Sequence, residues 1–499
     1  MNSDTTISRY EELRKFRTKF ETTAESAALL TLPTVFPQRG TGLSEYDEPI
    51  DGFGARGVNN LAAKLTLTLF PPTQSFFKLS VPHDIKAELE AMGAAEVLEE
   101  IENLLSSSES RILSSLASME HTATVFSLMR QLIVTGNGMV WLERDKDSMS
   151  ATVLSLRHYV LRRGNDGKIL ELIIMIPNED SDTGTEGNSV DYTQDAQYTH
   201  VLFDRDRQRY DVKQGDGENM AHIASYKESE LPFVIPRWNT LPGESYSVGL
   251  CGEHIGDLRS LEGCTQAITN VAAVTSRVIT LVDPASYTNP EDLRKASSGD
   301  YVSGRAEDVT PLVHGNPGDF SITLSLRESL LRNLSYVFLL NSSIQRDAER
   351  VTAEEIRFMA NELEAALGGV YSLLAGTLVR PMLQWVVAQL KELNVLPKFP
   401  EKVGDIEVVI VTGFDVLSRN SDFMKYQTIV ALVAQLFGEQ ALSYFKPRSI
   451  IMKLANAQGL DVSDILKTQE ELTQEQAMMV QAQAQAQAQG QQQQGEQSG

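Results

Sequence analysis

The sequence contains little cysteine, no surplus of basic residues and no long apolar run. Among its 499 residues are two cysteines, Cys251 and Cys264, so we expect no disulfide framework and predict that both are reduced, buried thiols. The N-terminal residues have no apolar signal core, and the longest apolar runs, such as 172–176, fall far short of the roughly 20 residues of a membrane span. We therefore expect neither secretion nor direct membrane contact.

The charge balance excludes one class of nucleic-acid-binding protein. Acidic residues outnumber basic ones by 67 to 44, which gives a formal net charge of −23. Because Lys and Arg contacts with phosphates supply most non-specific affinity for nucleic acid, a protein that grips DNA with a broad basic face is not expected. An acidic wall would instead repel a passing duplex, which favours sliding over holding.

The sequence also lacks the motifs of common catalytic and metal sites. No G-x-x-x-x-G-K-[ST] phosphate loop is present, so an ATPase on another chain would have to drive any movement of DNA. The seven histidines are scattered, without H-E-x-x-H or a Cys/His cluster, so we expect no zinc site. Segment 243–247 resembles a nucleophile elbow only loosely and is interpreted as a turn. We predict a protein that is not an enzyme, with no catalytic residue, metal or cofactor.

A formal G-x-G-x-x-G occurs at Gly52, Gly54 and Gly57, directly before a helical pattern. In a dinucleotide-binding unit this motif follows a buried parallel strand. Here the preceding residues are acidic and include Pro49, so no such strand is predicted. We interpret the glycines as a turn that lets the helix begin close to a neighbouring element.

The stretch 341–383 joins a polar, charged segment to a long amphipathic pattern. Thr352 and Glu355 have the spacing of a capping box, which predicts that a helix begins there. With a kink at Pro381, the helix would continue to about residue 394 and be roughly 60 Å long at about 1.5 Å per residue. Its apolar residues recur every three or four positions and form one stripe: Ile356, Met359, Leu363, Leu367, Val370, Leu374 and Leu378.

Periodicity predicts an α+β, mainly helical protein. Helical patterns cover most of the chain before 135 and after 250, and strands cover most of 139–238. Between Ile169 and Asp204 lie eight acidic residues and no Lys or Arg, and the core of this stretch, NEDSDTGTEGNS at 178–189, is interpreted as a solvated loop, with a functional acidic rim as the alternative. Since the chain is longer than a single core usually supports, two or more domains are expected. The Gln- and Ala-rich tail, 475–499, cannot build a core.

Several runs resemble the portal, or head-to-tail connector, family of autographivirus-type short-tailed podoviruses, and they occur in the family's order. The runs are GARGVNNLAAKL at 54–65, GESY at 243–246, GDLRSLE at 256–262, QRDAERVTAEEIR at 345–357 and LGGVYS at 367–372. The resemblance implies a portal-type fold with wing, stem, clip and crown, assembled as a ring around a central DNA channel. Taken by itself, the charged cluster directly before Thr352 could be a solvated loop. The resemblance instead implies that this cluster lies in the channel.

By resemblance, the chain divides into family parts. The expected parts are a wing at 1–176, a clip with adjoining stem at 177–250, a stem helix at 251–280, a second wing portion at 281–420 and a crown at 421–474. Within the second wing portion, 341–351 would be the channel loop and 352–394 the long kinked helix. The residues expected to line the DNA channel are Asn341, Gln345, Arg346 and Arg350, with Thr352, Glu355 and Pro381 as the cap and hinge of the helix.

The function implied by the resemblance is a conduit for double-stranded DNA during packaging, retention and ejection. The implied partners are other copies of the chain, normally twelve in all, the capsid and scaffolding proteins, the terminase and the tail adaptor proteins. The implied location is the portal vertex of the virion, with host cytoplasm during assembly. The alternatives are a packaging nuclease with metal-binding carboxylates around Asp180 or Glu354, and a scaffold-like oligomer without a channel.

Overall fold

The computed structural model divides into two compact units. Unit 1 comprises Met1–Phe70 and Ser118–Trp385, and unit 2 comprises Pro71–Ala117 and Val386–Gly499. The residues that the structure describes are 5–38, 48–71, 76–80, 95–119, 121–145, 148–177, 196–275, 280–311, 317–340, 353–367, 369–396, 409–412 and the single positions 432 and 435.

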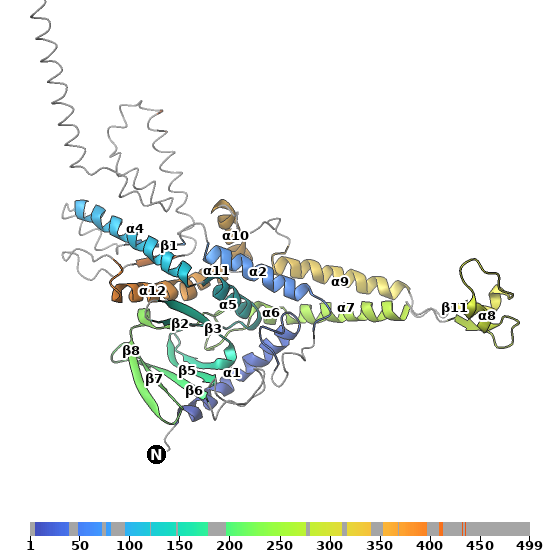
Figure 1. The fold of residues 1–499 in the computed structure, drawn as a ribbon, viewed down its shortest axis with the longest axis horizontal. Helices are drawn as coiled ribbons and strands as arrows, with labels where there is room; N and C mark the ends of the chain where they lie inside the picture. The colour runs from blue at the N-terminus through green and yellow to red at the C-terminus, as the bar shows by residue number, and fades with distance from the viewer. Residues whose placement is uncertain are drawn as a thin grey trace, which may run out of the picture. The chain divides into compact units, whose positions relative to one another are not determined.

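A five-stranded antiparallel sheet with the order β4-β5-β6-β7-β8 forms one part of unit 1. Helix α1 (Thr6–Leu29) packs against it, and Tyr10 and Leu13 of α1 join Ile173 and Tyr198 of the sheet in one apolar core. Figure 1 shows α1 lying along this sheet. The strands are β4 (Tyr159–Arg163), β5 (Ile169–Pro177), β6 (Ala196–Asp204), β7 (Arg209–Gly215) and β8 (Met220–Tyr226).

The local sequence explains both the helix and the first hairpin. The Thr5 side chain caps α1 by accepting a hydrogen bond from the Ser8 amide. Arg17 projects from α1 into the protein interior, where it donates to the backbone oxygens of Leu156 and Tyr159. The β4–β5 turn contains Gly167 at φ 82°, a left-handed conformation that glycine adopts readily and that the Asn-Asp-Gly sequence at 165–167 favours.

Side chains of the GESY run cover the outer edge of β4. The Leu161 amide donates to the Tyr246 hydroxyl at 2.9 Å, and the Arg163 amide donates to the Ser245 hydroxyl at 3.0 Å. These bonds satisfy amides that would otherwise be unpaired at an open edge of the sheet. Ser245 therefore has a structural role, which agrees with the interpretation of 243–247 as a turn.

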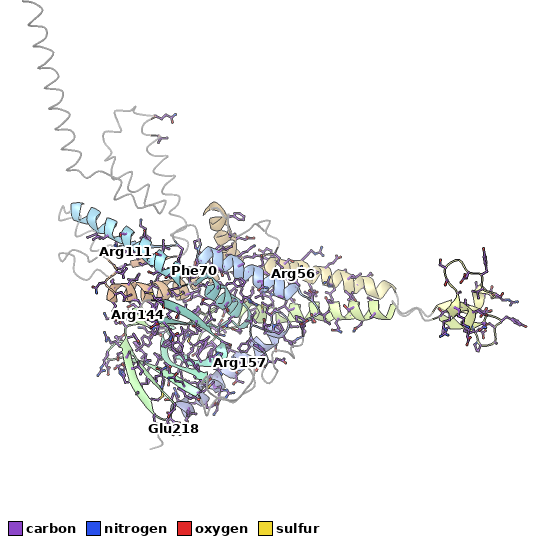
Figure 2. All side chains as sticks on the ribbon, in the orientation of Figure 1. Arg56, Phe70, Arg111, Arg144, Arg157 and Glu218 are labelled. Carbon is purple, nitrogen blue, oxygen red and sulfur yellow. The ribbon has the colours of Figure 1, made fainter. Side chains whose placement is uncertain are left out.

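Helices and a smaller sheet complete this part of unit 1. Helix α5 packs against α1, α2 and α6, and β2 pairs with both β3 and β9. In Figure 2, Arg157 lies beside α1, where it contacts the Glu25 carboxylate. The elements are α2 (Phe53–Leu69), α5 (His121–Thr135), β2 (Met139–Arg144), β3 (Met149–Leu154), η1 (Leu156–His158), η2 (Glu228–Glu230), β9 (Phe233–Val234) and α6 (Leu250–Glu253).

Two helices, α7 (Ile255–Thr275) and α9 (Pro317–Val337), pack side by side and form an arm (Figure 1). Between them in sequence lies the tip, residues 280–311. The tip contains β10 (Thr280–Val282), α8 (Pro290–Lys295), η3 (Ala306–Asp308) and β11 (Val309–Pro311), with β10 and β11 paired antiparallel. We call the rest of unit 1 the body.

The long helix predicted from 352 to 394 is interrupted in the structure. Helix α10 (Ala353–Ala366) ends before Gly369, whose φ of 91° is left-handed, and α11 (Val370–Leu374) begins after it. A π-helical turn (Ala375–Val379) then precedes α12 (Arg380–Glu392), and the predicted kink residue Pro381 lies just beyond this turn. Because Pro381 lacks an amide and clashes with the preceding turn, the wider π turn accommodates it. The predicted stripe is buried at Met359, Leu363, Val370, Leu374 and Leu378.

One stretch, Val370–Glu392, is long and apolar enough to span a membrane by length and composition. Of its most apolar window, 61% is buried inside the protein, as expected for a core helix. Among the described residues no other helix passes this test.

Unit 2 joins segments that are far apart in sequence. Strand β1 (Phe77–Ser80) pairs antiparallel with β12 (Val409–Thr412), so Phe77 lies opposite Thr412. The Glu109 side chain of α4 (Ala95–Ser118) accepts a hydrogen bond from the Leu79 amide. The backbone oxygen of Val395 accepts one from Arg111.

The compact units do not follow the part boundaries expected from the sequence. The expected boundary between 176 and 177 falls within a continuous sheet, because β5 pairs with β6 from Glu171 to Pro177. The expected first part also contains Pro71–Ala117, which belongs to unit 2. Residues 421–474 and 475–499 lie outside the described residues, apart from 432 and 435. Cys251 is buried and Cys264 half-buried, and both are free thiols.

Candidate functional site: the α2 seat

The end of α9 adopts a strained backbone conformation. The Leu340 amide donates to the Ser335 oxygen at 2.9 Å, which is the closing bond of a Schellman-type helix end. The residue in the left-handed position is Leu339, with φ 52°. Glycine normally occupies this position, because a branched side chain there costs conformational energy. The surrounding structure must therefore hold Leu339 in place.

One face of α2 provides that support, and we call it the α2 seat: Gly57, Asn60 and Lys64. The Asn60 side-chain amide donates to the backbone oxygens of Phe338 and Leu339, at 3.1 and 3.2 Å. The Lys64 ammonium donates to the Leu339 oxygen at 2.8 Å. Since the three seat residues are spaced by three and four, they lie on one side of the helix. Together they bind the backbone of the strained helix end.

Gly57 is required for the close approach of the two elements. A Cβ atom placed on it would lie 2.7 Å from Cγ of the Phe338 ring, well inside van der Waals contact. The same ring packs edge-to-face on Phe53 with centroids 6.3 Å apart. Gly54 likewise approaches the Leu30 backbone oxygen, which a Cβ atom would meet at 2.6 Å. The predicted close packing of the helix start is therefore confirmed for Gly54 and Gly57, but both lie within α2 and not in a turn, and a Cβ atom on Gly52 would meet nothing within 4 Å.

Lys64 also connects the seat to α10. Its ammonium lies 4.0 Å from the Glu362 carboxylate, and its side chain is about 7% exposed. Burial lowers the pKa of Lys64, and attraction to Glu362 offsets part of that effect. Lys64 therefore contacts both Leu339 at the end of α9 and Glu362 of α10, the next described helix along the chain.

The predicted channel residues follow, in sequence, the end of α9 that the seat binds. Asn341, Gln345, Arg346, Arg350 and Thr352 lie outside the described residues. Glu355 lies in α10, but its side chain is not among those described. The predicted hinge, Pro381, lies in α12. The structure thus locates both ends of the predicted channel loop and not the loop itself.

Sequence reasoning missed the seat residues Asn60 and Lys64. A signal was present, since both polar residues lie beside the apolar stripe of α2, where a lysine needs a specific partner. The partner itself is a backbone oxygen, which carries no sequence signature.

The described residues contain no group of three or more His, Cys, Asp or Glu side chains that could hold a metal ion. Of the carboxylates considered for a nuclease, Asp180 lies outside the described residues, and the side chain of Glu354 is likewise undescribed.

Comparison with known proteins decides the family. The model of the family described as "Bacteriophage head to tail connecting protein" matches residues 3–466. The chain belongs to this family. The portal protein of Enterobacteria phage T3 is 35% identical over 95% of this chain and 89% of its own length. The portal protein of Escherichia phage T7 is 34% identical over 94% of this chain and 89% of its own length.

More distant relatives and solved structures were also found. The portal protein of Enterobacteria phage SP6 is 26% identical over 95% of this chain and 92% of its own. The neck of the empty gene transfer agent particle, solved with C6 symmetry, aligns at 12% identity over 82% of this chain and 90% of that chain, with a TM-score of 0.40.

Family membership confirms the central predictions from the sequence. This head-to-tail connector is a structural protein and not an enzyme. Its role as a head-to-tail connector implies assembly as an oligomeric ring that associates with capsid and tail, between the head and the tail of the virion. The nuclease alternative is therefore wrong. Two of the runs that carried the resemblance have a structural role among the described residues. GARGVNNLAAKL contains the α2 seat, and GESY covers the β4 edge.

Proposed function

We propose that rings of this chain form the channel through which double-stranded DNA is packaged into the capsid, retained and ejected. The observation that carries the proposal is the match to the connector family over residues 3–466, since a connector between head and tail lies on the path of the genome. The formal charge of −23 supports it, because an acidic wall centres a duplex without binding it tightly.

Within the ring, we assign the arm to the stem, the tip at 280–311 to the clip and the body to the wing. Apolar side chains on α9, such as Ile322 at 67% and Leu326 at 50%, are exposed along the arm. Exposed apolar residues on neighbouring turns indicate a covered surface, and in a ring the cover is a second copy of this chain. Strands β6 to β8, assigned to the clip from the sequence, pair with β4 and β5 and therefore belong to the wing in this proposal.

The partners follow from the same assignment. We propose a dodecamer whose wings contact the capsid and scaffolding proteins and whose clips bind the terminase and then the tail adaptor proteins. Tyr287 and Tyr301 on the tip are almost fully exposed, at 93% and 103%, and aromatic side chains are common anchors of protein interfaces. The ring would assemble in the host cytoplasm and remain at the portal vertex, with its crown formed by 421–474 and without membrane contact.

The proposed mechanism is steric and electrostatic. Arg346 and Arg350, in the channel loop 341–351, would make weak contacts with passing phosphates, assisted by Asn341 and Gln345. At physiological salt such contacts are screened beyond about 8 Å, so they are local and reversible. The α2 seat supports this role because it fixes the backbone at Leu339, two residues before the loop begins at Asn341.

Electron microscopy of the purified protein, produced with its scaffolding protein, tests the ring. We expect ring-shaped particles with a central opening. Solid particles, or filaments, would exclude the channel and favour the scaffold-like oligomer.

Replacing both channel arginines tests the loop. We expect Arg346→Ala with Arg350→Ala to leave ring assembly intact and to lower genome retention or ejection. The matched control is Arg205→Ala with Arg207→Ala, on the exposed β6–β7 turn. Normal filling and ejection in the channel variant would remove the proposed role of these arginines.

A further inference from the structure

A compact hydrogen-bonded node joins the arm to the start of α2. Asp51 precedes α2, and its Oδ2 accepts from the Thr265 hydroxyl of α7 at 2.7 Å and from Nη2 of Arg327 in α9 at 3.0 Å. Nε of Arg327 donates to the same Thr265 hydroxyl at 3.0 Å. Each of the three side chains therefore contacts the other two.

Further hydrogen bonds hold both the carboxylate and the backbone of Asp51. Its other oxygen accepts from the Phe53 amide at 2.9 Å, in the first turn of α2. The Glu262 carboxylate of α7 accepts from the amides of Ile50 and Asp51 at 2.7 and 3.0 Å. Burial disfavours ionisation of Asp51, but bonds from Thr265, the Phe53 amide and Arg327 outweigh it and lower its pKa.

The node lies where the apolar burial of the arm ends. On its body side, Leu258 and Leu261 of α7 and Leu334 of α9 are buried. Toward the tip, Val271 of α7 and Ile322 of α9 are exposed. The node is thus at the point where the arm leaves the body.

A polar node at this point constrains direction in a way that apolar packing does not. Burial energy depends on area and is nearly independent of orientation, so apolar contact alone permits helices to tilt. The guanidinium of Arg327 is planar, and its Nε and Nη2 contact two different partners. Thr265 and Arg327 are thereby held together within the arm, and both donate to Asp51 of the body, so tilting the arm would break at least one of the two bonds to Asp51.

We propose that Asp51, Thr265 and Arg327 form a fulcrum that fixes the direction in which the arm leaves the body. This fixed direction sets the rotation between neighbouring copies, and a closed ring needs the same rotation at every interface. The fulcrum therefore makes the number of copies per ring uniform. This last step rests on the proposed ring assembly, whereas the fixed direction of the arm does not.

Fluorescence energy transfer between arm and body tests the fulcrum. Dyes are placed at Lys15→Cys on α1 and Asn270→Cys on α7, both exposed, in a Cys264→Ser background. Double-labelled chains are diluted in unlabelled chain, so that a ring holds one pair. In the parent chain we expect a narrow single-molecule distribution of transfer efficiency. The distribution should broaden in Arg327→Leu and in Thr265→Val, and the second substitution keeps the side-chain volume.

Two matched controls remove similar groups nearby. Arg332→Leu changes an exposed arginine of α9, and Thr269→Val removes a hydroxyl of α7 that bonds its own helix. Both should keep the narrow distribution. If Arg327→Leu does not fold, Thr265→Val carries the test. Equal widths in the node variants, the controls and the parent would overturn the fulcrum.

Native mass spectrometry of the same variants tests the consequence for the ring. We expect the node variants to show a wider spread of copy number than Arg332→Leu and Thr269→Val. An unchanged spread, with a broadened energy-transfer distribution, would overturn the link to copy number and leave the fulcrum standing. If the parent chain forms no ring with its scaffolding protein, the proposed function is wrong. Energy transfer measured in the monomer still tests whether Asp51, Thr265 and Arg327 fix the direction of the arm.

Discussion

Gly57 and Phe338 are in such close contact that a single methyl group would not fit between them. A Cβ on Gly57 would meet the ring at 2.7 Å, and the ring is itself buried against Phe53. The contact connects α2 with the strained end of α9, so changes here report on the whole α2 seat.

Gly57→Ala should destabilise unit 1 by about 1–3 kcal/mol, the usual cost of overpacking a core. The measurement is urea unfolding followed by near-UV circular dichroism. The control is Gly263→Ala in α7, where an added Cβ meets nothing within 4 Å. There the higher helix propensity of alanine should stabilise by about 0.5–1 kcal/mol. Equal changes in the free energy of unfolding at both positions would contradict the close contact between Gly57 and Phe338.

Lys64→Met should loosen the end of α9 without unfolding the protein. Methionine keeps most of the buried volume and removes the ammonium that binds the Leu339 oxygen. Hydrogen bonds to charged groups contribute about 1.5–3 kcal/mol, so protection of the peptide 330–340 in hydrogen exchange should fall by roughly ten- to a hundredfold. Lys15→Met, at an exposed position of α1, should leave it unchanged. Unaltered protection in Lys64→Met would show that Asn60 alone holds Leu339.

Glu171 should make unit 1 sensitive to acid. Burial opposes its ionisation, but bonds from His200 and Arg9 prevail and lower its pKa to about 2, from an ordinary value of 4.5. Because the folded pKa is the lower one, the stabilisation is complete above about pH 4.5 and is lost as the pH falls toward 2. Glu171→Gln should be less stable than the parent at pH 7, and the difference should shrink between pH 4.5 and 2. Glu328→Gln, on the exposed side of α9, provides the control.

Tyr246→Phe should weaken the edge of β4. The substitution keeps the buried ring and removes the hydroxyl that accepts from the Leu161 amide. An unsatisfied buried amide costs about 1–3 kcal/mol, so the urea midpoint should fall correspondingly. Tyr336→Phe, on an exposed tyrosine of α9, provides the control. A midpoint equal to that of the control would mean that another group covers the amide.

Local sequence signals predicted the elements of this fold better than their grouping. The Asn-Asp-Gly turn and the helical spacing of apolar residues in α1 and α2 depend on near neighbours, and such signals are readable from the sequence. The spacing is not sufficient by itself, because Phe16 shares the period of Leu13 and Phe20 in α1 and is nevertheless 66% exposed. The break at Gly369 was missed because the apolar period of Leu363, Val370 and Leu374 continues across it. Consecutive glycines at 368 and 369 were the available signal for a helix end.

The grouping into units depends on contacts between distant residues. The pairing of β5 with β6 joins residues on the two sides of 178–195, at the place where the family resemblance implied a part boundary. The α2 seat depends on a left-handed Leu339, a conformation that leucine rarely adopts and that tertiary contacts impose. No window of neighbouring residues contains these interactions.

The pairing of Phe77 with Thr412 has a consequence for how the protein is made. Strand β1 emerges from the ribosome long before its partner β12 has been translated. At about 5–20 residues per second, the wait is on the order of 20–70 s. Unit 1 contains most of the intervening chain and is complete at Trp385, so it can fold during that interval. Unit 2 is therefore the last to close, and its unpaired strand is the part of the nascent chain most in need of protection from aggregation.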